Sequence, residues 1–173
     1  VKLILIESWD ERRVLETLTS LAVRRALSIV LWSVTEGLQR LGFGTDGADQ
    51  HNSTEPEAAL RLIKADVQPT LYVMCDLHPF LSDNPKLVRL LKEIAMSEDA
   101  HKPTLVLVSH ACKLPAEVQR YAARFALALP SEDELLAIVR EEAASWSERN
   151  RNVRVRTDNK TLQQVVKNLR GMS

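Results

Sequence analysis

Short apolar runs that recur between longer amphipathic segments are the feature that most constrains the fold of this chain. Each run holds five to seven residues. Runs of this length are typical of strands buried on both faces, and the segments between them are long enough to carry the chain back across a sheet. The sequence therefore predicts an α/β fold with a five-stranded parallel sheet and helices on both faces. The predicted strands are residues 1–6, 28–32, 69–75, 104–108 and 125–129.

Capping signals indicate where the helices between these strands begin. The signals are Ser8 with Glu11, Thr54 with Glu57, Asn84 with Pro85, and Pro130 with Ser131. A serine or threonine followed three residues later by glutamate satisfies two backbone amides at a helix start, and proline is tolerated in the first turn. We expect helices from these points to about residues 26, 63, 94 and beyond 139. We also expect short helices over 35–41 and 115–123, and a last helix that stops at Gly171.

The charge and cysteine content exclude several classes of function. The chain has 173 residues with 23 basic and 23 acidic side chains, so no overall field attracts nucleic acid or an anionic membrane. No apolar stretch is long enough to span a membrane, and we expect a cytoplasmic protein. Cys75 and Cys112 lack the spaced partners of a zinc or redox site, so we interpret both as buried hydrophobic residues. The chain opens inside an apolar run without a starting Met, and we expect it to be a piece of a longer protein.

The first junction between strand and helix lacks what a phosphate-binding loop requires. No glycine precedes Gly37, and no lysine occurs in the segment from Glu7 to Arg13. A phosphate cradle needs converging backbone amides, which glycines permit, and usually a lysine. Glu7 and Asp10 instead place carboxylates where the anion would lie. The junction therefore predicts that no triphosphate binds there.

Polar residues at the ends of the later strands are the remaining site candidates. Asp76 ends the third predicted strand and would cap a turn or hold a hydrated magnesium ion. His78 and His110 both follow strands and could in principle meet, but two histidines without a third ligand fall short of a catalytic metal site. Ser109 ends the fourth strand without the turn motif of a hydrolase nucleophile. The strand-end candidates are thus Glu7, Asp10, Asp76, His78 and Ser109; we assign no catalytic, cofactor-binding or metal residue.

Two further patterns match known motifs only by their letters. Residues 42–47 read as a glycine-rich dinucleotide fingerprint, but they follow a predicted helix rather than the first strand. The densest basic set is Arg149, Arg151, Arg154 and Arg156, and acidic residues flank or interrupt it. We therefore interpret this stretch as a solvated connection rather than a nucleic-acid site.

Several segments together resemble a known family. They are Glu7-Ser8-Trp9-Asp10-Glu11-Arg12-Arg13-Val14, Leu31-Trp32-Ser33-Val34-Thr35-Glu36-Gly37, Asp76-Leu77-His78-Pro79-Phe80-Leu81, Lys113-Leu114-Pro115 with Glu117, Leu129-Pro130-Ser131-Glu132-Asp133-Glu134-Leu135, and Asn168-Leu169-Arg170-Gly171. With these the chain resembles the N-terminal half of an AAA-family ATPase known as an open reading frame of algal plastids and cyanobacteria, with relatives in other bacteria. The likeness covers nearly the whole chain.

The resemblance implies a degenerate AAA-like α/β domain over 1–130, built like a P-loop NTPase but without the phosphate loop. Residues 131–173 would form part of a helical lid. Residues 7–13 stand where the phosphate loop would be, Asp76 where the magnesium-orienting aspartate would be, and Ser109 where a γ-phosphate sensor would be. Leu77 replaces the acidic neighbour that such an aspartate usually has. ATP and magnesium are expected only in a downstream module.

We therefore expect a non-catalytic, ATPase-like regulatory or assembly domain of a larger AAA protein. Its expected partner is an AAA module of the same or a neighbouring chain, with a homo-oligomer as a further option, and neither nucleic acid nor membrane. The alternative is a phospho-acceptor or weak nucleotide-binding enzyme domain in which Glu7, Asp10 and Asp76 form an acidic pocket opposite Ser109. Whether the chain is itself an enzyme stays open at this point.

Overall fold

A computed structural model describes residues 1–41, 53–99, 101–111, 113–126, 131–150 and 159–171. The chain forms two compact units, Val1–Leu127 and Ala128–Ser173. Unit 1 contains one sheet, and its strands are β1 (Leu3–Glu7), β2 (Ile29–Ser33), β3 (Gly37–Leu41), β4 (Leu71–Cys75), β5 (Thr104–Ser109) and β6 (Ala122–Ala126). The strand order is β3-β2-β4-β5-β1-β6.

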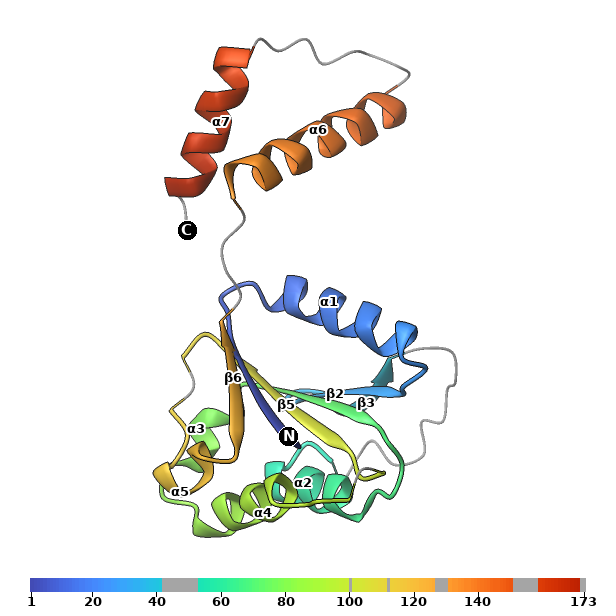
Figure 1. Ribbon diagram of the computed structural model, residues 1–173, viewed down its shortest axis with the longest axis vertical. Helices are drawn as coiled ribbons and strands as arrows, with labels where there is room; N and C mark the ends of the chain where they lie inside the picture. Colours follow the sequence, from blue (N-terminus) through green and yellow to red (C-terminus); the bar gives the residue numbers. More distant parts are fainter. Residues whose placement is uncertain (42–52, 100, 112, 127–130, 151–158, 172–173) are drawn as a thin grey trace. The chain divides into compact units, whose positions relative to one another are not determined.

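Helices cover both faces of this sheet (Figure 1). On one face lies α1 (Glu11–Arg24), whose Val14, Leu18 and Ala22 pack with alternate residues of the strands. The other face carries α2 (Pro56–Ala65), α3 (His78–Leu81), α4 (Pro85–Ala95) and α5 (Ala116–Gln119). Successive residues of a strand point to opposite faces of the sheet, and helices cover both faces. Residues at odd and at even positions must therefore both be apolar, which explains the continuous apolar runs.

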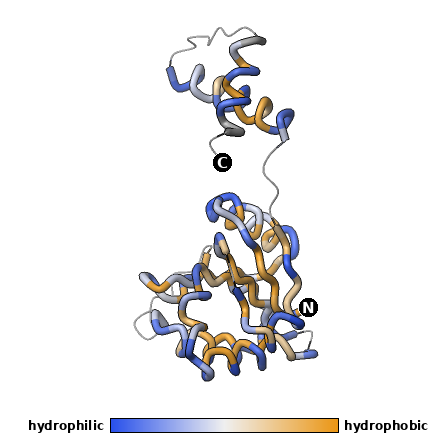
Figure 2. The backbone as a smooth tube through the Cα atoms, turned by 90° about the vertical axis from the view of Figure 1, so that its left-hand side faces the viewer, coloured by the Kyte–Doolittle hydropathy of each residue, from blue (hydrophilic) through white to orange (hydrophobic). Residues whose placement is uncertain are grey.

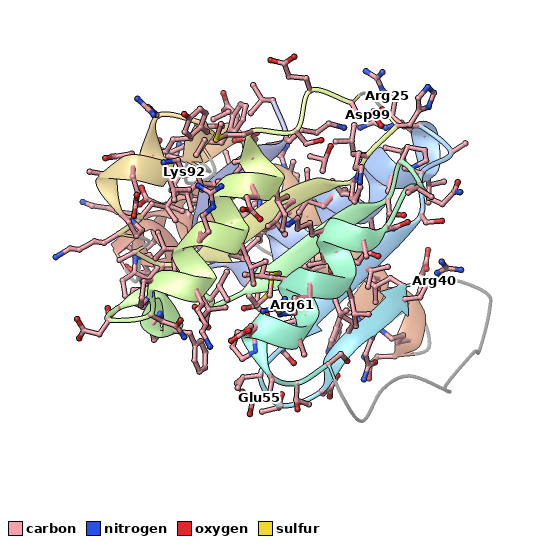
Figure 3. The ribbon with its side chains drawn as sticks, turned by 90° about the horizontal axis from the view of Figure 1, so that it is seen from below. Arg25, Arg40, Glu55, Arg61, Lys92 and Asp99 are labelled. Carbon is pink, nitrogen blue, oxygen red and sulfur yellow. The ribbon has the colours of Figure 1, made fainter. Side chains whose placement is uncertain are left out.

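The buried side chains lie where the hydrophobic runs predicted them. Figure 2 shows the hydrophobic stretches along the strands and on the helices of unit 1. Leu3 and Leu5 of β1 and Leu105 and Leu107 of β5 are almost fully buried. Each such leucine contributes about 1.5–3 kcal/mol relative to an exposed one. Seen from below, α2 and α4 lie side by side under the sheet, with charged side chains such as Arg61 and Lys92 on them (Figure 3).

The predicted sheet of five parallel strands is wrong, because the sheet has six strands and is mixed. Residues 37–41 form β3 rather than the expected short helix over 35–41, and β3 pairs antiparallel with β2. The hydroxyl of Ser33 accepts a hydrogen bond from the amide of Glu36 at 3.2 Å, which closes the turn. Gly37 then takes a positive φ of 71°, a conformation that reverses the chain easily only at glycine.

The last strand of the sheet also lies earlier than predicted. The strand expected at 125–129 is β6, Ala122–Ala126, and the helix expected at 115–123 is the shorter α5. β6 runs parallel to β1 in a register that places Leu3 opposite Ala122 and Ile6 opposite Phe125. As an edge strand it keeps an exposed arginine, Arg124, so its apolar pattern is weak.

Two of the four predicted capping signals are confirmed. Asn84 accepts the amide of Leu87, and Ser131 forms a full capping box with Glu134. The box expected at Ser8 is wrong, because the helix starts two residues later, where Asp10 accepts the amide of Arg13 at 3.0 Å. The box expected at Thr54 is also wrong, because Glu55 precedes the first residue of α2 without a capping bond from its side chain.

Unit 2 consists of α6 (Glu132–Arg149) and α7 (Asn159–Gly171). The two helices contact each other, and Val166 of α7 is buried between them. Arg149 lies 3.6 Å from Glu142, while Arg151, Arg154 and Arg156 lie outside the described residues. The dinucleotide-like letters at 42–47 and Cys112 also lie outside them. None of the described helices is sufficiently long and apolar to cross a membrane.

Replacing Gly37 with alanine should destabilise unit 1. A β-carbon there would lie 2.6 Å from the hydroxyl of Ser53 at a backbone φ of +71°. That hydroxyl accepts the amide of Leu38, while the carbonyl of Ser53 accepts the indole N–H of the buried Trp32. We expect Gly37→Ala to lower the free energy of unfolding by about 1–3 kcal/mol in urea titrations.

The control is Gln39→Ala in the same strand, for which we expect a loss below about 1 kcal/mol. Equal unfolding midpoints for the two variants would show that the positive φ and the close approach to Ser53 carry no cost.

Candidate functional site

The carboxyl ends of β1, β4 and β5 bring polar residues together at one edge of the sheet. The register places Glu7 of β1 opposite Ser109 of β5. Ser8 donates its amide to the carbonyl of Ser109, and Asp76 donates its amide to the carbonyl of Val108, each at 3.0 Å. Parallel strands end on the same side of a sheet, which is where ligands of such folds bind. The predicted candidates therefore do lie along one edge.

Ser109 is the centre of this edge. Its side chain is 4% exposed, and its hydroxyl donates to Oδ1 of Asp76 at 2.9 Å. The hydroxyl oxygen of Ser109 also lies 3.0 Å from Nδ1 of His78. A hydroxyl has a single proton, so once it donates to the carboxylate it accepts from His78. This arrangement assigns the imidazole proton to Nδ1 of His78 and leaves the lone pair of Nε2 without a role in the cluster.

The order of these three groups differs from that of a hydrolase. A nucleophilic serine needs a histidine that removes its proton while an acid orients the far side of the ring. Here the serine lies between the acid and the histidine, and its proton is directed to Asp76. The geometry therefore directs the proton of Ser109 to a carboxylate and not to a histidine base. The sequence predicted all three residues but not their order.

An aromatic row continues from this cluster to the surface. The rings of His78 and His110 lie 5.7 Å apart at 82°, so the two histidines do meet. The ring of His110 lies 4.6 Å from the indole of Trp9 at 33°. The sequence favours core or interface anchoring for Trp9 over base stacking. It does not predict the contact with His110, because no local pattern joins the first junction to the residue after β5. Only the register of β1 against β5 brings them together.

The acidic residues at this edge have partners of their own. Glu7 lies 3.6 Å from Arg124 of β6, and Asp10 caps the first turn of α1. Arg124 was missed because the predicted strand began one residue after it. Asp76, the third acidic candidate, accepts a hydrogen bond from the hydroxyl of Ser109. Its backbone φ is 52°. Within the described part of the chain, no group of three or more His, Cys, Asp or Glu side chains is arranged to hold a metal ion.

Cys75 lies directly before Asp76, and its thiol is unreactive. Its thiol is buried, and burial together with the nearby Glu11 raises its pKa to about 12. A thiol with so high a pKa is almost wholly protonated at neutral pH, and only the thiolate is a good nucleophile. Cys75 is thus a small buried hydrophobic residue, as the sequence analysis expected.

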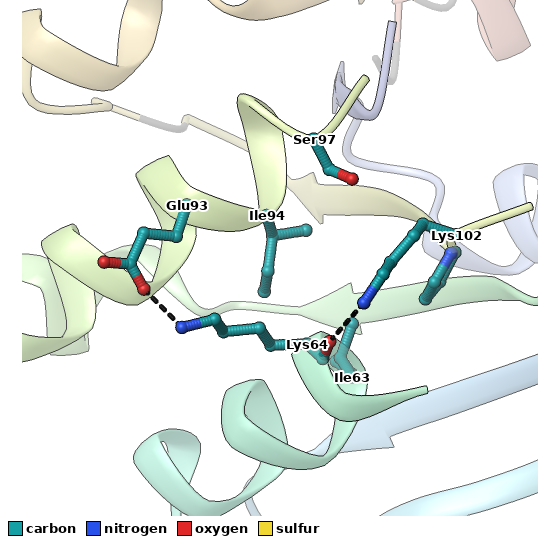
Figure 4. A pocket seen from close by; sticks show the side chains of 7 residues that line it. Ile63, Lys64, Glu93, Ile94, Ser97 and Lys102 are labelled. Atoms are coloured by element: carbon teal, nitrogen blue, oxygen red, sulfur yellow. Dashed lines mark hydrogen bonds and ion pairs between the residues drawn. The ribbon is translucent and has the colours of Figure 1, made fainter. Parts of the chain in front are cut away.

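A cavity of about 120 Å³ lies elsewhere, at the amino end of the strands between α2, α4 and the residues before β5 (Figure 4). None of the five candidate residues lines it. Lys64 on its wall is bound to Glu93 at 2.6 Å, and Lys102 donates to the carbonyl of Lys64 at 3.4 Å. Lys64 and Glu93 thus bind each other, while Lys102 binds a backbone carbonyl. The cavity is not part of the strand-end cluster.

The Ser109 geometry predicts one tautomer of His78. When its ring is neutral, we expect His78 to carry the proton on Nδ1. Long-range ¹H–¹⁵N correlation on histidine-labelled protein measures this directly. Ser109→Ala removes the acceptor and should abolish the preference, whereas Ser97→Ala, on the wall of the cavity beside α4, should leave it intact. A wild-type His78 protonated on Nε2 contradicts the assigned hydrogen-bond order.

Comparison with known proteins agrees with this architecture. Residues 1–127 match the family described as the N-terminal domain of SpoVK-like AAA ATPases, and residues 133–173 match the second domain of the same ATPases. The curated proteins contain no match.

A chain in the structure of the E. coli MS115-1 HORMA:CdnC:Trip13 complex is similar with a TM-score of 0.59 and 12% identity. The match covers 96% of the present chain but only 58% of that chain, and at this identity it shows the fold alone. The match over residues 1–127 is the stronger finding, and it shows that this chain belongs to the SpoVK-like AAA ATPases.

Proposed function

We propose that this chain is a non-catalytic, ATPase-like domain that regulates or assembles a larger AAA protein. The observation that carries the proposal is the first crossover, Glu7 to Arg13, which holds neither a glycine nor a lysine. In an ATP-hydrolysing module this crossover would wrap the phosphates with backbone amides. Family membership supports the larger protein, and the crossover supports the lack of catalysis.

The side chains around this crossover oppose an anion. Asp10 uses a carboxylate oxygen to accept an amide of the first turn of α1, so one donor that a phosphate would need is already bound. A phosphate charge about 4 Å from such a carboxylate would be repelled by about 4 kcal/mol at an effective dielectric constant near 20. The positive end of α1 is compensated by the chain itself.

The position of the expected magnesium aspartate is also altered. Asp76 is held by Ser109, and the next residue, Leu77, is almost fully buried in the core. A hydrolytic site needs a second polar group there to orient water, and a buried leucine cannot supply one. Both positions favour a scaffold over a catalyst.

The remaining parts of the proposal concern the larger protein. ATP and magnesium would bind in a module outside this chain, and the partner of this domain would be an AAA module of the same or a neighbouring chain. A cytoplasmic location and kinship with the plastid and cyanobacterial reading frame belong to the same proposal. The kinship rests on the resemblance, and the composition of the crossover depends on neither.

Calorimetry tests the absence of nucleotide binding. Titration of this chain with ATP and magnesium should give only the heat of dilution, because the crossover offers no amide cradle and carries opposing carboxylates. Asp76→Asn should behave identically, since Asp76 is not a ligand in this account. Saturable heat with micromolar affinity would refute the proposal.

A phospho-acceptor enzyme is the second candidate, because Asp76 keeps 59% of its side chain exposed at the strand edge. Incubation with acetyl phosphate and magnesium, followed by intact-mass measurement, separates the two functions. Our proposal expects no phosphoryl adduct. An adduct that disappears in Asp76→Asn would establish the acceptor function instead.

A further inference from the structure

Trp9 is a largely exposed aromatic residue that contacts a neighbouring ring. Its side chain is 86% exposed, yet the indole lies against His110 at a ring separation of 4.6 Å. A tryptophan in water leaves a large apolar area unburied, and such residues are enriched among those that dominate binding at protein interfaces. Trp9 therefore contacts one neighbouring ring and keeps most of its surface exposed.

The support behind Trp9 reaches into the buried end of the sheet. His110 contacts His78, and His78 is hydrogen-bonded to the buried Ser109, which in turn binds Asp76. Each contact limits the rotation of the next ring. A side chain ordered before binding loses less conformational entropy on binding, which favours affinity. These contacts connect the buried end of the sheet to the indole of Trp9.

A second exposed aromatic residue lies at the same end of β1. Phe125 of β6 is 56% exposed and stands opposite Ile6 in the parallel register, while Trp9 follows β1 by two residues. The ion pair of Glu7 with Arg124 and the carboxylate of Asp76 lie along the same edge. Aromatic anchors within a polar border are typical of protein–protein interfaces.

We propose that Trp9 is the anchor through which this edge docks onto another AAA module. The inference rests on the proposed function, which supplies the occupant: the chain matches the N-terminal and second domains of an AAA ATPase and spans 58% of a similar chain of known structure. An apolar hollow on that module would receive the outer face of the indole. Phe125 would add area beside it, and the charged groups would set the orientation.

Hydroxyl-radical footprinting with mass spectrometry tests this docking. The oxidation rate of Trp9 is measured in this chain and in the larger AAA protein that contains it. We expect the rate to fall by about fivefold or more in the larger protein, as for a residue at the core of an interface. Trp32, which is fully buried in unit 1, should stay unreactive in both samples and serves as the internal reference.

Matched variants of the larger protein separate the anchor from the fold. Trp9→Ala should weaken assembly in sedimentation velocity, and His110→Ala, which removes only the support, should weaken it less. Val23→Ala removes another exposed apolar side chain, on α1, and should leave assembly unchanged. Circular dichroism should show all three variants folded, since the altered side chains are outside the core.

Each other outcome counts against a named part of the account. If Trp9 stays reactive while other peptides of residues 1–127 are protected, the anchor inference is wrong and the proposed function stands. If no peptide of residues 1–127 is protected, both are wrong. If Trp9 is protected in this chain alone as its concentration rises, the occupant is a second copy, which overturns the proposed partner.

Discussion

The parallel pairing of β1 with β5 on one side and β6 on the other is the constraint on which the rest of the molecule depends. Its register sets Glu7 against Ser109 and Ile6 against Phe125. A shift of one residue would turn the apolar side chains of β1 from one helical layer to the other and separate the groups at its end. The buried leucines and isoleucines that fix this register therefore also fix the site.

Because of this register, the polar groups at the carboxyl ends of the strands bind one another. Asp10 satisfies the start of α1, Arg124 lies beside Glu7, and Ser109 binds both Asp76 and His78. Polar groups that are paired in this way gain little from a ligand, because binding would first break an existing hydrogen bond or ion pair. This pairing supports our proposal that the edge presents a surface and holds no phosphate.

Hydrophobic periodicity predicted most of the sheet because both faces of the strands are buried. It failed where local geometry decides: Gly37 turns the chain into β3, and the alanine-rich β6 has too few large side chains to mark its start. Strand-end position selected Asp76, His78 and Ser109 as candidates, and the structure brings the three into hydrogen-bond contact. Strand-end position could not reveal Arg124 or Trp9, since their contacts depend on registers between distant segments that no local pattern encodes.

Amide chemical shifts of residues 8–13 test the central claim most directly. Uniformly ¹⁵N-labelled protein is titrated with ATP and magnesium while the amides of Ser8 to Arg13 are followed. If the chain's own carboxylates occupy the start of α1, these amides should keep their positions at millimolar nucleotide. Saturable shifts confined to the amides from Ser8 to Arg13 would contradict the account, because they would place phosphate oxygens where Glu7 and Asp10 are said to exclude them.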